Sequence, residues 1–223
     1  MKIRPLIRKF LLHFAHHDLA RSMIFVGRMR AQWTANEYIE ANMHDKPYYP
    51  TSEGAMLHAL KEVTVKGLYL EFGVFTGISL RHIEKNTPEH QEIHGFDSFE
   101  GLPGYWSPGY NKNLQVKKIP TFSDRVKLHV GWFDDTVPVF KLTNPGEISF
   151  IHFDADMYES TKTVFDQLGG RIVPGTVIIF DNYFGFQFWR QHEYRALQEF
   201  IMESGLSYEY LCYTDQKCAI KIK

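Results

Sequence analysis

The chain has few cysteines and no long apolar run. Only Cys212 and Cys218 are cysteines among its 223 residues, too few for the disulfide framework of a small secreted domain and no basis for a zinc site. We expect both to be free thiols. No apolar stretch reaches the ~20 residues that span a bilayer, and the basic start lacks the apolar core and cleavage site of a signal peptide. The sequence predicts a cytoplasmic protein without a transmembrane segment.

An excess of charge of either sign is also missing. The formal net charge is −1, which gives no general attraction to the phosphates of a nucleic acid. Outside the N-terminus there is no basic stripe interleaved with aromatic residues. We therefore expect no nucleic-acid partner.

A dinucleotide fingerprint is the third absence. The first glycine-rich turn reads Glu-Phe-Gly-Val-Phe-Thr-Gly over residues 71–77, and Phe75 stands where G-x-G-x-x-G needs a glycine to close on a pyrophosphate. This disfavours NAD and FAD. S-adenosylmethionine (SAM) carries an ammonium and a carboxylate, which suit an acidic residue and a glycine turn at a helix N-terminus. We predict SAM contacts from Glu71, Gly73, Val74, Phe75, Thr76, Gly77 and Ser79.

The first part of the chain, residues 1–65, is predicted to be a helical extension or lid. An apolar stripe between Ile3 and Phe14 is flanked by arginine and lysine, which is typical of an amphipathic helix. We expect this helix to pack on the domain or on a second copy of the chain, which makes a homodimer reasonable. A membrane surface is the alternative. Thr34 and Glu37 have the spacing of a capping box, which predicts a helix that begins there.

The second part, residues 66–223, alternates strands and helices. Strands are predicted at residues 67–73, 92–99, 126–133, 147–156 and 175–182, with two more within 207–223. The alternation indicates parallel strands joined by crossover helices, whereas the last two strands are joined too closely to be parallel. We predict a Rossmann-like α/β three-layer sandwich. Its mostly parallel seven-stranded sheet ends in an antiparallel C-terminal hairpin, the layout of class I methyltransferases.

Ligands bind such sheets at the carboxyl ends of the strands. Asp97 ends the second predicted strand, where an acidic side chain can bind ribose hydroxyls, and Ser98 follows it. A turn or N-cap role for Asp97 is the alternative. Gly131, Trp132 and Phe133 follow the third strand, where a flat wall for adenine is expected, although ordinary core packing of the two aromatic residues stays open.

Five segments occur in order along the chain: EFGVFTGISL, GFDSFEGLP, GWFDDTVP, HFDADMYEST and IIFDNYFG. Together they resemble the macrocin O-methyltransferase family, whose members methylate sugar hydroxyls of macrolides and related glycosides. The resemblance covers about residues 67–200. It implies SAM as the methyl donor, a divalent metal that is usually Mg²⁺, and a sugar or another small molecule as the acceptor.

Oxygen-bearing side chains end the fourth and fifth predicted strands. Asp154 ends the fourth, and Asp181 and Asn182 end the fifth. The carboxyl ends of adjacent parallel strands meet, and two carboxylates with an amide oxygen suit Mg²⁺. The family usually has two aspartates after the fifth strand. The Asp-Asn pair is similar to that of the catechol O-methyltransferases instead. Helix capping or direct contact with SAM are the alternative roles.

The reaction needs a group that takes the proton of an acceptor hydroxyl. Asp156 is the first candidate and His192 the second, while Asp154 would hold the hydroxyl through the metal. His152 lies within a predicted strand and is expected to be a core histidine with its hydrogen bonds satisfied.

Two aromatic loops are predicted to build the acceptor pocket, one with Tyr105, Trp106 and Tyr110, the other with Tyr183, Phe184, Phe186, Phe188 and Trp189. A phenolic acceptor, as for catechol O-methyltransferases, is the alternative to a sugar. A binding protein that keeps the fold without catalysis is the second alternative.

Overall fold

The computed structural model describes residues 22–108 and 114–223. The amphipathic helix predicted near the N-terminus, and Tyr110, lie outside these residues. The α-helices are α2 Met23–Asn42, α3 Ser52–Lys61, α4 Ile78–Lys85, α5 Phe133–Thr143, α6 Tyr158–Leu168 and α7 Glu193–Ser204. The strands are β1 Leu68–Phe72, β2 Ile93–Asp97, β3 Val126–Val130, β4 Ile148–Phe153, β5 Ile172–Phe180, β6 Tyr208–Tyr213 and β7 Cys218–Ile222. Two short 3₁₀ helices, η2 Gly169–Arg171 and η3 Trp189–Gln191, flank β5 and its following loop.

One seven-stranded sheet organises the described chain. Its strand order is β3-β2-β1-β4-β5-β7-β6. The pairs from β3 to β5 are parallel, and β7 is antiparallel to both β5 and β6. The predicted Rossmann-like sandwich with an antiparallel C-terminal hairpin is therefore confirmed.

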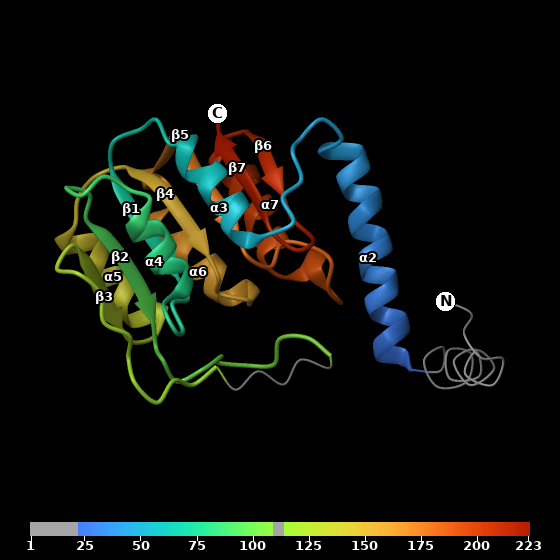
Figure 1. Cartoon of the computed structure of the whole chain (residues 1–223), viewed down its shortest axis with the longest axis horizontal. Coiled ribbons are helices and arrows are strands. Elements are labelled where there is room, and N and C mark those ends of the chain that lie inside the picture. The colour runs from blue at the N-terminus through green and yellow to red at the C-terminus, as the bar shows by residue number, and fades with distance from the viewer. Residues whose placement is uncertain (1–21, 109–113) are drawn as a thin grey trace, which may run out of the picture.

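Helices cover both faces of the sheet. In Figure 1, α3 and α4 lie on one face and α5, α6 and α7 on the other. Each face has its own apolar core. Because α3 packs on β5, β6 and β7, the last part of the predicted N-terminal extension belongs to the helical layer of the domain.

A row of phenylalanines aligns the ends of four strands. Phe96, Phe72, Phe153 and Phe180 occupy paired positions on β2, β1, β4 and β5, and neighbouring rings stack with centroids 4.7, 5.5 and 5.3 Å apart. Cross-strand aromatic pairs stabilise a sheet and help to hold its register. The residues that directly follow this row are Asp97, Gly73, Asp154 and Asp181. The register of the core thus brings these residues to one edge of the sheet.

The starts of two elements differ from the sequence prediction by three residues or more. Strand β5 begins at Ile172, before the predicted start at residue 175, because a register shift at Gly175, with φ +98°, lets the strand continue. Thr34 does not begin a helix. It lies inside α2, where its hydroxyl donates to the carbonyl of Ala31, and the true N-cap is Ser22. The N-cap of α3 is Thr51, whose side chain accepts a hydrogen bond from the backbone N–H of Gly54.

Helix α2 lies beside the β6 edge of the sheet (Figure 1). Ala31 and Ala35 are its buried residues, whereas Val26, Met29 and Trp33 are exposed. These three are spaced by three and four residues, so they share a face that points away from the domain. Such an apolar face fits a homodimer, which stays a prediction. No helix among the described residues is long and apolar enough to cross a membrane.

The two cysteines are free thiols, as predicted, and both are buried. Burial raises the pKa of Cys212 to about 12. These groups are therefore neutral packing residues at physiological pH.

A histidine pair on β2 and β3, with His94 buried and His129 half-buried, predicts loss of stability in acid. His94 Nδ1 lies 3.2 Å from His129 Nε2, and burial lowers the pKa of each ring to about 4. Unfolded histidine binds protons near pH 6.5. The unfolded chain therefore takes up protons first, and the free energy of unfolding is expected to fall as the pH drops from about 6.5 to about 4.

Denaturant titrations between pH 7.5 and 4.5 measure this effect. His129→Phe keeps the ring that stacks on Phe96 at 4.4 Å and should flatten the pH dependence. His90→Phe is the matched control at an exposed position and should leave it unchanged. Equal slopes in wild type and His129→Phe would contradict the assignment.

Candidate active site

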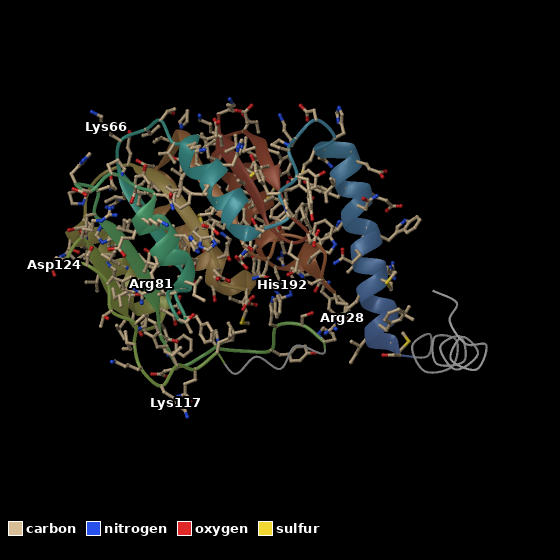
Figure 2. All side chains as sticks on the ribbon, viewed as in Figure 1. Arg28, Lys66, Arg81, Lys117, Asp124 and His192 are labelled. Carbon is tan, nitrogen blue, oxygen red and sulfur yellow. The ribbon has the colours of Figure 1, made fainter. Side chains whose placement is uncertain are left out.

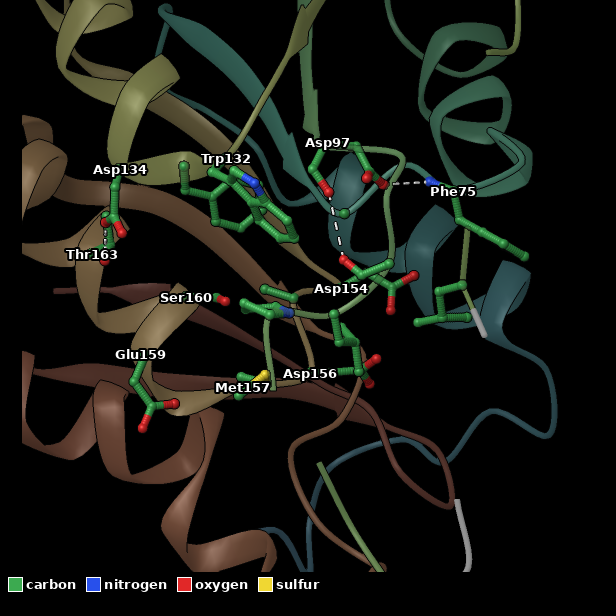
Figure 3. Close-up of a pocket in the computed structure, with 18 of the residues that line it drawn as sticks. Phe75, Asp97, Trp132, Asp134, Asp154, Asp156, Met157, Glu159, Ser160 and Thr163 are labelled. Atoms are coloured by element: carbon green, nitrogen blue, oxygen red, sulfur yellow. Dashed lines mark hydrogen bonds between the residues drawn. The ribbon is translucent and has the colours of Figure 1, made fainter. Parts of the chain in front are cut away.

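One cavity of about 790 Å³ opens at the carboxyl edge of the sheet. Its volume lies in the range of small-molecule sites. Figure 3 shows Asp97 and Phe75 at the upper right, Trp132 to the left of Asp97, and Asp154 and Asp156 below them. The predicted site residues that line it are Gly73, Phe75, Asp97, Ser98, Trp132, Phe133, Asp154, Asp156 and Asp181.

The Asp97 carboxylate holds the conformation of the glycine turn at the cavity wall. Its Oδ2 accepts hydrogen bonds from the backbone N–H groups of Val74 and Phe75 at 2.8 and 2.7 Å, and its Oδ1 accepts one from Phe99 at 2.6 Å. The turn-holding alternative considered for Asp97 is thus present in the structure. Carboxylate oxygens have several lone pairs, so these bonds leave room for a ligand hydroxyl.

Backbone strain in the turn points to a constrained functional loop. Phe75 has φ +49° although it is not glycine, a conformation that costs of order 1–3 kcal/mol and persists where the surroundings enforce it. The two N–H bonds to Asp97 supply that constraint. Phe75 is partly exposed at the cavity wall.

Adding one methyl group at Gly73 is expected to lower the stability of the fold strongly. Its φ is +95°, and a Cβ there would lie 2.0 Å from the backbone carbonyl oxygen of Asp154. Gly73→Ala must therefore push β1 from β4 at the cavity, and we expect a loss of more than about 2 kcal/mol in the free energy of unfolding. Gly170→Ala, where no atom lies within 4 Å, is the control. Thermal unfolding measures both, and equal melting temperatures would contradict the steric argument.

Several predicted cofactor residues do not line the cavity. They are Glu71, Val74, Thr76, Gly77, Ser79 and Gly131. Val74 acts through its backbone bond to Asp97. Glu71 is fully buried behind the cavity and accepts a hydrogen bond from His152. Trp132 and Phe133 line the wall as predicted, at the start of α5.

The two aspartates that follow β4 and β5 converge. Asp154, Asp181 and His152 each offer one ligand atom, and these three atoms lie within 4.8 Å of one another. Burial raises the pKa of the Asp154 carboxyl. The ammonium of Lys217, from the turn between β6 and β7, forms an ion pair with Asp181. Lys217 was not predicted as a site residue, because its position depends on the tertiary pairing of the hairpin.

Asn182, the third predicted metal ligand, is hydrogen-bonded to Asp156 and Glu193. Its side chain is buried and its Nδ2 donates to Asp156 Oδ1 at 2.7 Å, while its backbone N–H donates to Glu193 Oε2 at 3.0 Å. Glu193 is buried at the start of α7, and burial raises its pKa to about 8. Asp156, with φ +61°, is thus held by a network that reaches α7. Glu193 was missed in the sequence because a glutamate in the first turn of a helix is common.

His192 and the described aromatic residues of the two loops do not line the cavity. His192 is at the N-terminal end of α7 (Figure 2), and burial lowers its pKa. Tyr183, Phe184, Phe186 and Trp189 are core residues. Trp106 is also buried, with its ring 5.0 Å from Phe186. The prediction that these aromatic residues build the pocket is wrong for the buried ones, because they pack against one another and α2. Leu102, Pro103, Leu114 and Met157 provide apolar walls instead.

The fold and this cavity define the class of the protein. A family model described as a methyltransferase domain matches residues 70–183. The match runs from within β1 to the residues after β5 and includes the glycine turn and all the aspartates that line the cavity. The chain belongs to this methyltransferase-domain family and has the class I methyltransferase fold.

Individual relatives agree with the family. The chain is 27% identical over 143 residues to an 8-demethyl-8-(2,3-dimethoxy-alpha-L-rhamnosyl)-tetracenomycin-C 4'-O-methyltransferase of Streptomyces olivaceus, over 53% of this chain and 54% of that protein. The chain thus matches about half the length of this curated relative.

Two solved structures have the same fold. The crystal structure of the calicheamicin methyltransferase CalS11 has a TM-score of 0.63 at 20% identity and covers 99% of this chain and 94% of its own. The O-methyltransferase NovP has a TM-score of 0.60 at 22% identity, over 76% and 78%.

Proposed function

We propose that this protein is a SAM-dependent O-methyltransferase that methylates a hydroxyl group of a sugar or glycoside. The observation that carries the proposal is the cavity in which the glycine turn, held by Asp97, lies together with Asp154, Asp156 and Asp181. A methyl donor and an oxygen nucleophile must meet in one site. The curated relative is named as a methyltransferase of a rhamnosyl compound, and one CalS11 structure as a TDP-rhamnose 3'-O-methyltransferase.

The cofactor would occupy the side of the cavity nearest β1 and β2. Asp97 and Ser98 offer oxygens to the ribose hydroxyls, and Trp132 offers a flat surface to the adenine. The turn at Gly73 lets the backbone approach the methionine part of SAM. In this proposal residues 66–223 form the catalytic domain and residues 1–65 its helical extension.

Asp156 is proposed as the base that takes the proton of the acceptor hydroxyl. It lines the cavity two residues beyond Asp154. The Asn182 amide donates to one of its oxygens, which orients the carboxylate in the cavity. Removing the proton raises the nucleophilicity of the oxygen that attacks the sulfonium methyl. His192 remains the second candidate, at a greater disadvantage because it does not line the cavity.

A divalent cation is proposed at Asp154 and Asp181. Their carboxylates converge at the sheet edge, and hard oxygen donors suit Mg²⁺ or a similar ion. The Lys217 ammonium pairs with Asp181, so this carboxylate already has a cationic partner. A bound ion would lower the pKa of the acceptor hydroxyl and hold it near the methyl group. Asn182 stays proposed as a further ligand through its amide oxygen, while its Nδ2 donates to Asp156.

Two experiments test the proposal. Calorimetry with SAM in the metal-free protein should detect binding, and a methyl-transfer assay with SAM should be run with TDP-rhamnose, with other sugar nucleotides and glycosides, and with caffeate. Transfer to a sugar supports the proposal. Transfer only to caffeate supports the phenolic alternative instead. SAM binding without transfer to any acceptor supports the non-catalytic alternative, and no SAM binding contradicts the methyltransferase assignment itself.

A further inference from the structure

His152 carries a nitrogen that the fold leaves without a hydrogen bond. Its side chain is only 1% exposed. Nδ1 lies 2.7 Å from Glu71 Oε1, whereas Nε2 has no hydrogen-bond partner and faces Asp181 Oδ1 at 3.5 Å. The sequence predicts a core histidine with its hydrogen bonds satisfied, and the structure meets this prediction at Nδ1 only. A buried polar atom without a partner is costly, and in a native site it indicates a missing ligand.

The bond to Glu71 determines what Nε2 can bind. A carboxylate accepts hydrogen bonds, so Nδ1 donates to Glu71 and Nε2 is the nitrogen left to face the second carboxylate, Asp181. A nitrogen and a carboxylate oxygen that face one another share a positive charge, either a proton on Nε2 or a metal ion bound by both. A carboxylate behind a histidine is also the arrangement that orients metal-binding histidines in proteins.

The strand pattern places His152 and Asp154 on the same face of the sheet. Side chains two residues apart in a strand lie on the same face, and Asp154 directly follows β4, two residues after His152. Glu71 is its paired neighbour on β1. Ligand atoms on one small divalent ion lie within about 4 Å of each other, and the atoms of His152, Asp154 and Asp181 lie within 4.8 Å. A side-chain adjustment of about 1 Å completes the set.

We propose that His152 Nε2 joins Asp154 and Asp181 in binding the divalent cation of this site. The inference rests on the proposed metal-assisted methyl transfer and adds the identity of the ligands. One imidazole nitrogen with two carboxylates favours a transition metal such as Mn²⁺ over Mg²⁺, which prefers oxygen ligands only. Lys217 occupies the same carboxylate, so it must leave Asp181 when the metal binds.

Electron paramagnetic resonance of bound Mn²⁺ tests the ligand set without any turnover. Mn²⁺ alone is added to the metal-free protein, and electron spin echo modulation reports nitrogen nuclei bound to the ion. We expect the modulation of a histidine nitrogen in the wild type, its loss in His152→Asn, and its retention in His192→Asn. Calorimetry should give at least tenfold tighter binding of Mn²⁺ than of Mg²⁺.

Two further variants separate binding from positioning. Glu71→Gln keeps the shape but removes the carboxylate behind His152, so Mn²⁺ affinity should fall about tenfold or more while the nitrogen modulation remains. Lys217→Met removes the competing ammonium and should tighten Mn²⁺ binding. Circular dichroism and SAM calorimetry of each variant show whether the fold is kept.

Three outcomes would overturn the inference. They are bound Mn²⁺ without nitrogen modulation, nitrogen modulation that survives in folded His152→Asn, and no Mn²⁺ binding by a wild-type protein that binds SAM. In each of these the SAM-dependent function can still hold, because SAM binding and methyl transfer are measured separately. Failure of SAM binding would instead contradict the proposed function.

Discussion

Asp97→Ala is expected to weaken SAM binding at least about a hundredfold, or ~2.8 kcal/mol. The carboxylate accepts three backbone hydrogen bonds, from Val74, Phe75 and Phe99. Removing it leaves three N–H groups without their acceptor and releases the strained turn at Phe75. It also removes the oxygens proposed for the ribose hydroxyls. Each lost charged hydrogen bond is worth about 1.5–3 kcal/mol, so the effect on the turn alone is large.

Calorimetry with SAM, together with thermal unfolding, measures the effect. Asp97→Asn keeps one acceptor oxygen and should bind SAM with intermediate affinity. Glu100→Ala, at an exposed position in the same loop, should bind like the wild type. Should Asp97→Ala bind SAM within threefold of the wild type, neither the turn nor the ribose role of Asp97 would stand.

Asp156→Asn is expected to lower kcat about 10²- to 10⁴-fold, the range for loss of a general base. Asparagine has nearly the same size, tolerates the positive φ of this residue, and can still accept from the Asn182 amide with its carbonyl oxygen. A purely structural role would therefore survive this substitution, whereas proton transfer would not. The affinity for SAM should change less than threefold.

A methyl-transfer assay that measures S-adenosylhomocysteine formation across pH checks this result. Asp156→Ala serves as the second variant, because it removes both the base and the acceptor of Asn182. Wild-type kcat in Asp156→Asn together with a low kcat in Asp156→Ala would assign Asp156 to structure and return His192 to first place.

The sheet could be predicted because its signals are local. Apolar runs of strand length alternate with helices, and acidic residues stand where strands end, so the order of parallel strands and the edge that holds Asp97, Asp154 and Asp181 follow from the chain itself. The row of stacked phenylalanines one position earlier then sets their register. A residue directly after a strand is well predicted because the strand leaves it little freedom.

The remaining parts of the site depend on contacts between distant segments. Asn182 follows Asp181 in sequence, yet its side chain is directed by Asp156 and its backbone by Glu193 of α7. Strand periodicity puts His152 and Asp154 on the same face. Which nitrogen of His152 lacks a hydrogen bond depends on its contact with Glu71 on another strand. The aromatic loop after β5 resembled a sugar-binding wall, and only its packing against α2 and Trp106 identifies it as core.

The position of Lys217 in the chain determines when the charge of Asp181 gains its cationic partner during synthesis. Asp154 and Asp181 belong to strands in the middle of the sheet, whereas the ammonium that pairs with Asp181 comes from the turn between β6 and β7. During synthesis the two carboxylates leave the ribosome before the hairpin that carries Lys217. In the proposed metal site, an ion bound at that stage would offset the repulsion between the carboxylates in the incomplete sheet, and Lys217 of the completed hairpin would later compete with it.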